Sequence, residues 1–155
     1  MQAPERTNPG SLADYLEVMS KSVFQAGMSW KVVDAKWPDI RQAFRGFEPA
    51  VVANLTEDDL DELTNDRRVI RNRRKLEAIV VNARRITELA ERHGSFRDYL
   101  RSHGEFEKTV TDLRKQFRFL GDMSAYHFLW VVNEEVPSYE DWCASRGRTP
   151  KTTYH

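Results

Sequence analysis

The chain has 155 residues and carries 24 basic and 24 acidic side chains, so its formal net charge at pH 7 is zero. Hydrophobic residues make up 40% and charged residues 31%, a balance typical of a globular protein with a buried core. No stretch approaches the roughly 18 consecutive apolar residues of a membrane span, and residues 1–10 lack the apolar segment of a secretory signal, so we expect no membrane partner.

Cys143 is the only cysteine, which excludes an internal disulfide and is typical of a reducing compartment. We therefore expect a cytoplasmic protein, and we expect it to be a monomer. The length predicts a single domain. Its expected limits are residues 11–146, after a flexible arm at 1–10 and before a C-terminal tail at 147–155.

Apolar residues recur at spacings of three and four along most of the chain, and no alternating run is long enough for a convincing strand. The predicted fold class is therefore all-α. Ser11 is a good N-cap for a first helix that ends near Phe24. A second helix is expected from Trp30 to about Lys36, where Pro38 stops it. Short helical segments are expected to start at Pro38 and at Pro49.

The later part of the chain is predicted to contain the longest helix. Thr56 and Asp59 have the spacing of a capping box and start the helix before it. The longest helix is expected over residues 72–93, where apolar residues form one stripe and Gly94 ends the element. Further helices are predicted after Ser95, over 105–116, around 126–132 and after Ser138.

The turn between the first two helices carries the motif Gln25-Ala26-Gly27-Met28-Ser29-Trp30. Gly27 allows close approach of the backbone to a partner because it has no Cβ. Met28 offers an apolar wedge and Trp30 a flat stacking surface, the two features needed to extract one base from a duplex and hold it. The alternative is an ordinary corner between helices, with Trp30 in the core.

Charge is unevenly distributed along the chain. Residues 57–66 contain six acidic side chains and no basic one, whereas residues 67–85 contain eight basic side chains against Glu77. The local positive excess predicts contacts with DNA phosphates. The alternative is a solvated helix face whose arginines pair with the acidic segment. The candidate phosphate contacts in this segment are Arg71, Arg73, Arg74 and Lys75.

A second motif, Phe117-Arg118-Phe119-Leu120-Gly121-Asp122-Met123-Ser124-Ala125, lies between two predicted helices. Its layout is that of a helix-hairpin-helix, in which the first backbone N–H groups of the second helix point at a DNA phosphate. Arg118, Gly121 and Ser124 are then candidate contacts to the DNA backbone. The usual pattern has Gly where this chain has Phe119, so an unrelated corner between helices is the alternative.

Together these motifs resemble those of the DNA-3-methyladenine glycosylase I family, bacterial repair enzymes of the helix-hairpin-helix glycosylase superfamily. The resemblance rests on residues 25–30, 70–84 and 117–129 in that order, with the segment 47–53 between them, and extends from about Leu16 to Val132. It implies a helix-hairpin-helix glycosylase fold. It also implies base-excision repair: a damaged base of the 3-methyladenine type is flipped out of double-stranded DNA, and its N-glycosidic bond is hydrolysed. A nucleoid-associated bacterial protein would fit this activity.

The resemblance also assigns roles to individual residues. Gly27 and Met28 would fill the gap left by the flipped base, and Trp30 would stack on that base. The turn around Gly121 would grip the phosphate backbone. The other residues assigned to the base pocket are Ser22, Gln25 and Tyr126.

The chain departs from the family at three points. The family has a structural zinc site of cysteines and histidines, whereas this chain has one cysteine and four histidines at unsuitable positions, so we expect no metal and no cofactor. The family's N-terminal segment, which supplies pocket aromatic residues, is expected to have no counterpart before Ser11. The family's base-reading Glu falls at Ser22, which removes the charge complementary to a cationic base.

Asp141 is a candidate catalytic acid. Other branches of the superfamily place a catalytic Asp twenty residues after the hairpin Gly, and here that residue is Asp141. The alternative is that Ser138 caps a last helix and Asp141 only favours its N-terminal dipole. Two functions follow from the sequence, a DNA glycosylase and a non-catalytic DNA- or lesion-binding relative, with a protein-interacting helical domain as a third.

Overall fold

A computed structural model describes residues 5–154 and confirms the all-α fold class, with no strand in that part of the chain. The helices, in chain order, are α1 (Leu12–Gln25), α2 (Trp30–Ala43), the 3-10 turn η1 (Arg45–Phe47), α3 (Pro49–Val52), α4 (Glu57–Asn65), α5 (Arg73–His93), α6 (Phe96–Arg101), α7 (Phe106–Gln116), α8 (Asp122–Val131) and α9 (Tyr139–Ser145). Within residues 5–154, no helix has the length and apolar character needed to cross a membrane.

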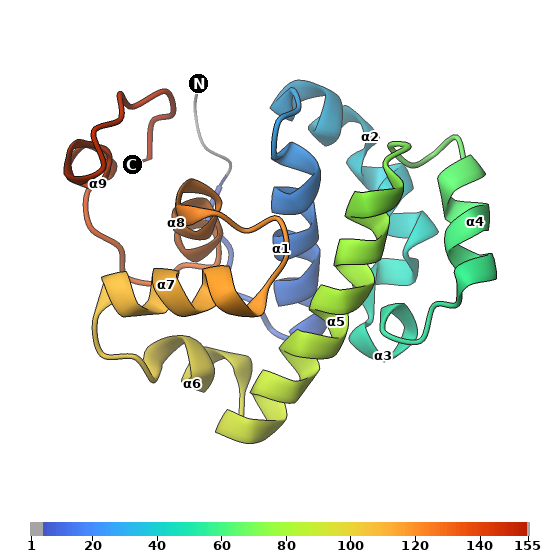
Figure 1. Ribbon diagram of the computed structural model, residues 1–155, viewed down its shortest axis with the longest axis horizontal. Coiled ribbons are helices and arrows are strands. Elements are labelled where there is room, and N and C mark those ends of the chain that lie inside the picture. The colour runs from blue at the N-terminus through green and yellow to red at the C-terminus, as the bar shows by residue number, and fades with distance from the viewer. Residues whose placement is uncertain (1–4, 155) are drawn as a thin grey trace.

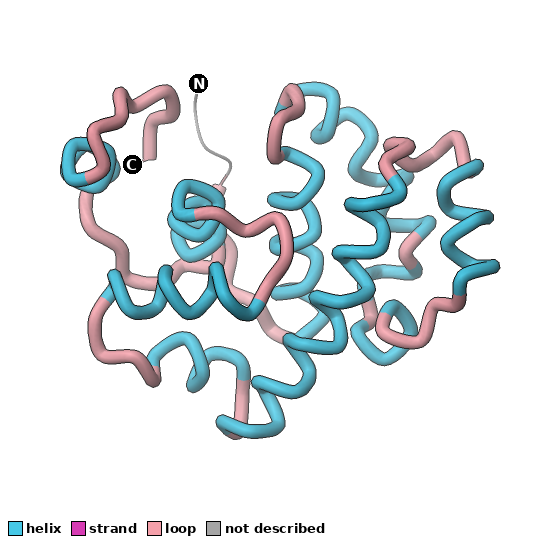
Figure 2. Tube along the Cα trace, viewed as in Figure 1, coloured by secondary structure: helices cyan, strands magenta, loops and turns pink. Residues whose placement is uncertain are grey.

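Helices α1 and α5 form the centre of the molecule, with α2, α3 and α4 on one side and α6 to α9 on the other (Figure 1). Helix α5 contacts α1, α3, α4 and α6, and α1 also contacts α2 and α8. Short loops join most of the helices, and longer loops flank α9 (Figure 2). The apolar stripe predicted along α5 is buried, as shown by Leu76, Ile79 and Ile86, each fully covered.

The predicted N-caps are confirmed, because each capping side chain accepts a hydrogen bond from the backbone three residues later. Ser11 caps α1, Ser95 caps α6 and Ser138 caps α9. Thr56 and Asp59 form a complete capping box at the start of α4. These local signals fixed the starts of the helices more closely than the apolar pattern could.

The expected end of α2 at Pro38 is wrong. The helix continues to Ala43 with Pro38 inside it. Val33, Trp37 and Ile40 are buried at helical spacing on both sides of the proline. An interior proline costs about 3 kcal/mol, and burial of these side chains, about 1.5–3 kcal/mol each, outweighs that cost.

Both ends of the described chain pack beside α8, whereas an arm and a tail outside the domain were expected. Arg6 Nε donates to the Trp130 carbonyl at 2.7 Å, and the guanidinium lies 5.0 Å from the Trp130 ring centroid. Tyr154 packs against the same indole at 5.0 Å between ring centroids. Residues 1–4 of the expected arm lie outside the described residues.

Lys75 joins the start of α5 to the turn between α1 and α2. Its side chain is 4% exposed, and Nζ donates to the carbonyls of Phe24 at 3.1 Å and Ala26 at 2.6 Å. These carbonyls end α1, where backbone acceptors lack helical partners. Burial lowers the pKa of the Lys75 ammonium. Lys75 is therefore not available for the phosphate contact predicted from its sequence position.

We expect Lys75→Met to lower the free energy of unfolding by about 1–3 kcal/mol, because two carbonyls at the end of α1 lose their donor. Urea unfolding followed by circular dichroism measures the change. Arg74→Met is the matched control, since Arg74 is the exposed neighbour on the same helix, and it should change stability by less than about 0.5 kcal/mol. Equal effects of the two substitutions would contradict a structural role for Lys75.

Candidate functional site

A cavity of about 100 Å³ opens where the end of α1, the first turn of α2, α8 and the C-terminal segment meet. Three of the four residues predicted to form a base pocket, Ser22, Gln25 and Trp30, line it. Ser124, predicted as a backbone contact, lines it as well. The remaining lining residues are Ala26, Met123, His127, Tyr139, Thr152 and Tyr154.

Trp30 is the first residue of α2, so the turn that precedes it sets its position. Ser29 Oγ caps the helix by accepting from the Val32 amide at 3.4 Å. The indole is half-buried, and its ring centroid lies 4.7 Å from that of His127 at an interplanar angle of 55°. Trp30 therefore forms a wall of the cavity and is not a fully buried core residue.

His127 is a cavity residue that the sequence reasoning missed. Its Nδ1 is 2.7 Å from the Tyr154 hydroxyl, and burial lowers the pKa of the imidazole to about 4, so the ring is neutral near pH 7. The missed signal was spacing, because His127 lies four residues after Met123 and three after Ser124, and these spacings place it on the same face of α8.

Tyr126 lies on another face of α8 and does not line the cavity, contrary to its predicted role. Its hydroxyl donates to the Pro137 carbonyl at 2.5 Å, and its ring packs against Tyr139 and Tyr154 at 5.0 and 5.3 Å between centroids. Burial raises the pKa of Tyr126 to about 12. Tyr126 thus supports two wall residues from behind.

The C-terminal segment closes one side of the cavity. Thr152 and Tyr154 contribute to its lining, and Tyr154 also packs against Tyr139 at 4.6 Å between ring centroids. Burial raises the pKa of Tyr139 to about 12 and also raises that of Tyr154, so both phenols are neutral near pH 7. In the sequence analysis this segment was expected to be a C-terminal tail outside the domain.

The turn that carries Gly27 lies beside the cavity. Gly27 is exposed with φ of +74°, a conformation that residues with a side chain rarely adopt. Met28, predicted to act as a wedge, is partly buried against the core. Among the described residues, the large apolar side chains that are exposed are Val32 at 46% and Phe119 at 38%. Neither was proposed from the sequence as a DNA contact.

The turn between α7 and α8 is held by Asn82 of α5. The Asn82 side chain is 1% exposed and makes two hydrogen bonds with the backbone of Arg118, accepting from its amide at 2.9 Å and donating to its carbonyl at 3.2 Å. Phe119 then adopts φ of +58°, in the left-handed region where the usual pattern has Gly. The predicted contacts Arg118 and Gly121 are both exposed.

The first turn of α8 has an acidic residue at its start. Asp122 Oδ1 accepts from the Met123 amide at 2.9 Å. Arg146 and Arg148 lie 3.4 and 3.7 Å from the Asp122 carboxylate and offset its charge. Arg146 also binds Glu107 at 3.0 Å, so the two arginines at this end of α8 are balanced by two carboxylates.

The basic segment divides into paired and unpaired side chains. Arg73 pairs with Glu57 and Asp61 of the acidic segment and also with Glu77. For this arginine, pairing with the acidic segment is the correct alternative. Arg71 and Arg74 are exposed and form no ion pair with the described residues. Because Lys75 Nζ binds the Ala26 carbonyl, these two free arginines lie at the end of α5 that meets the Gly27 turn.

Asp141 is exposed in the first turn of α9, and it does not line the cavity. Its amide donates to Ser138 Oγ at 3.2 Å. This is the geometry of a residue at the start of a helix, where an acid also favours the helix dipole.

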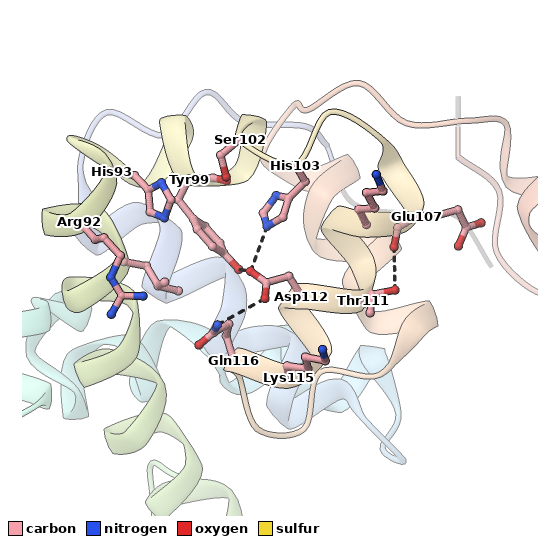
Figure 3. Close-up of a pocket in the computed structure, with 12 residues that line it drawn as sticks. Arg92, His93, Tyr99, Ser102, His103, Glu107, Thr111, Asp112, Lys115 and Gln116 are labelled. Atoms are coloured by element: carbon pink, nitrogen blue, oxygen red, sulfur yellow. Dashed lines mark hydrogen bonds and ion pairs between the residues drawn. The ribbon is translucent and has the colours of Figure 1, made fainter.

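A larger cavity of about 560 Å³ lies between α5, α6 and α7 (Figure 3). Its centre is Asp112, which accepts from the Tyr99 hydroxyl at 2.6 Å and lies 2.9 Å from His103 Nε2. None of the residues proposed from the sequence lines this cavity. Within residues 5–154, no group of three His, Cys, Asp or Glu side chains is placed to hold a metal ion.

We expect the neutral His127 to make stability depend on pH. Its folded pKa of about 4 lies below the ordinary 6.5, so its contribution is complete above pH 6.5 and is lost as the pH falls toward 4. The linkage predicts a loss of about 2 kcal/mol between pH 7 and pH 5. Urea unfolding at both values checks this, and a His127→Gln variant that loses as much stability as the wild type would refute it.

The chain is similar in sequence and in fold to known proteins of one family. The model of the methyladenine glycosylase family matches residues 11–124. DNA-3-methyladenine glycosylase 1 of Escherichia coli (strain K12) is 30% identical over 136 residues, covering 72% of this chain and 73% of the relative. DNA-3-methyladenine glycosylase of Haemophilus influenzae is 32% identical over 126 residues, covering 68% of each chain. The structure of 3-methyladenine DNA glycosylase I from Staphylococcus aureus superposes with a TM-score of 0.72 at 26% identity, over 81% of this chain and 78% of that one. The chain belongs to the methyladenine glycosylase family.

Proposed function

We propose that this protein is a DNA glycosylase that flips a damaged base from double-stranded DNA into the α1–α2–α8 cavity and hydrolyses its N-glycosidic bond. The observation that carries the proposal is the cavity itself, where Ser22, Gln25 and Trp30 meet Ser124 and His127. Ser22 and Gln25 precede the Gly27 turn and Trp30 follows it. Ser124 and His127 follow the Gly121 turn. The relatives named above are glycosylases for 3-methyladenine, so an alkylated base is the first substrate to test.

The proposed extraction step uses the turn between α1 and α2. Gly27 is exposed and Met28 is next to it, so the turn can enter the gap that a flipped base leaves in the duplex. Trp30 then stacks on the extruded base from inside the cavity. An alkylated base that carries a positive charge is already a good leaving group, so holding it out of the duplex supplies much of the catalysis.

The proposed DNA backbone contacts lie on both sides of the cavity. Arg71 and Arg74 are exposed near the Gly27 turn, and Arg118 is exposed on the turn before α8. At the start of α8, the Met123 amide is already bound by Asp122 Oδ1, so a phosphate there would bind the neighbouring first-turn amides, which lack helical acceptors. Such contacts carry no base information and mainly set register and affinity.

The second candidate function is recognition of DNA or of a lesion without excision. It is favoured by one observation, that no Asp or Glu lines the cavity. Asp141, the acid proposed from the sequence, is exposed outside the lining. The two functions differ in a single product, the abasic site.

The test of the proposed function is incubation of the full chain with duplexes that each carry one lesion, followed by cleavage at abasic sites. The panel includes cationic methylated purines, uncharged alkylated purines and deaminated bases. We expect strand cleavage with at least one lesion. If the protein binds a lesion more tightly than undamaged duplex and yields no abasic site from any duplex, the second candidate function holds.

We expect Trp30→Ala to weaken binding of the lesion duplex and its excision together, by about fivefold to 150-fold, because base–aromatic stacking contributes about 1–3 kcal/mol. Affinity for undamaged duplex should stay within twofold. Fluorescence anisotropy and single-turnover cleavage measure these quantities. Asp141→Asn is the control outside the cavity and should keep the wild-type excision rate; a slower rate with unchanged binding would restore Asp141 as a catalytic residue.

The double substitution Arg71→Gln with Arg74→Gln should reduce the slope of log affinity against log salt by about 2 for every duplex, since each phosphate contact contributes about 1. Anisotropy titrations over a range of salt concentrations measure the slope. Arg73→Gln is the matched control, because Arg73 is already bound by three carboxylates. A slope that changes as much in the control as in the double variant would exclude this phosphate path.

A further inference from the structure

The cavity wall contains a buried hydrogen-bond acceptor without a donor. Gln25 is 6% exposed and lines the cavity, and its Oε1 accepts no hydrogen bond from the described residues. A buried polar atom without a partner is unfavourable, so native structures almost always satisfy it. A ligand in the cavity with an N–H group would supply the missing donor.

The other polar groups of the wall are uncharged. Ser22 Oγ donates to the Val18 carbonyl at 3.2 Å, within its own helix. His127 is neutral, and the Tyr139 and Tyr154 phenols are neutral because burial raises the pKa of each. No Asp, Glu, Lys or Arg side chain lines the cavity.

The charges behind the wall also cancel. Lys21 and Asp34 are the charged groups that act on His127, with opposite effects on its pKa. They bind each other at 2.6 Å between Nζ and Oδ1. The cavity therefore has no net negative charge to offset the desolvation of a cation. The face of Trp30 offers a cation–π contact, which is the one feature that favours a positive base.

We propose that this cavity selects an uncharged nucleobase that donates an N–H group to Gln25 Oε1, in preference to a cationic alkylated base. The inference rests on the proposed function, because it assumes that a base enters this cavity, and it narrows the substrate class to uncharged alkylated or deaminated bases. Ser22 and Gln25 are the specificity-determining residues, since both project from α1 into the same wall.

The experiment compares two base analogues of the same shape that differ in charge. The cation is 3,9-dimethyladeninium, in which the 9-methyl group stands for the sugar. Its uncharged match is 3-deaza-3,9-dimethyladenine, in which carbon replaces the methylated nitrogen. Both carry the exocyclic amino group that would donate to Gln25. Binding to the full chain is measured by calorimetry at pH 8.5, where the aminopyridine ring of the deaza analogue is unprotonated, and by shifts of the His127 and Trp30 NMR signals.

The wild type should bind the uncharged analogue at least tenfold more tightly than the cation. Gln25→Leu should lose at least tenfold in affinity for the uncharged analogue. Ser22→Glu introduces a carboxylate into the wall and should reverse the preference, whereas the uncharged control Ser22→Gln should not. Because a buried Glu can prevent folding, thermal unfolding is recorded for each variant, and the wild-type and Gln25→Leu results decide the proposal if Ser22→Glu does not fold.

Tighter binding of the cation, equal binding of both analogues, or binding of neither would overturn the inference. So would an unchanged affinity in Gln25→Leu. Failure of the proposed function gives a different pattern. Excision of a cationic lesion together with a preference for the cation would leave the glycosylase and remove the neutral-base selectivity. A preference for the uncharged analogue without any abasic product would leave the neutral-base selectivity and remove the glycosylase.

Discussion

The contact between the Lys75 ammonium and the carbonyls of Phe24 and Ala26 ties the start of α5 to the turn between α1 and α2. A buried ammonium has a large desolvation cost unless it is fully hydrogen-bonded. The end of a helix supplies suitable partners, because its last carbonyls lack internal donors and carry the negative end of the helix dipole. The position of Trp30, which follows that turn, depends on this contact.

The same helix also holds the second turn of the site. Asn82 lies seven residues after Lys75, or about two helical turns, so both side chains leave the same face of α5. Asn82 binds the backbone of Arg118 before the Gly121 turn. One rigid helix thus sets the spacing between the two loops proposed to contact DNA, and loops held in this way keep the precise geometry that a binding site needs.

The cavity wall is uncharged, and no acid lines it. Both features affect how readily a bound base can leave its sugar. A cationic base leaves readily and needs little activation, whereas an uncharged base is a poorer leaving group and gains more from a proton donor. If the cavity selects an uncharged base as proposed, hydrolysis of its N-glycosidic bond would be slow, because no acid lines the cavity to activate the leaving group. Base selectivity and the rate of excision are therefore separate properties of this site.

The sequence by itself determined the features that depend on local chemistry. Helix starts at Ser11, Thr56 and Ser95 followed from capping side chains, and the buried stripe of α5 followed from its spacing. The ordered motifs around Gly27 and Gly121 identified the family, because each combines a turn with the helix that follows it. Trp30 could be proposed as a cavity residue from the sequence, because the adjacent turn sets its position.

Tertiary structure alone decided which side chains remained available. Lys75 and Arg73 belong to the same basic run as Arg74, yet Lys75 caps α1 and Arg73 binds carboxylates, two of them on α4. His127 and Tyr154 lie 27 residues apart and form one wall of the cavity. No local pattern predicts such pairings, because they arise when distant segments pack together and exclude water from the groups between them.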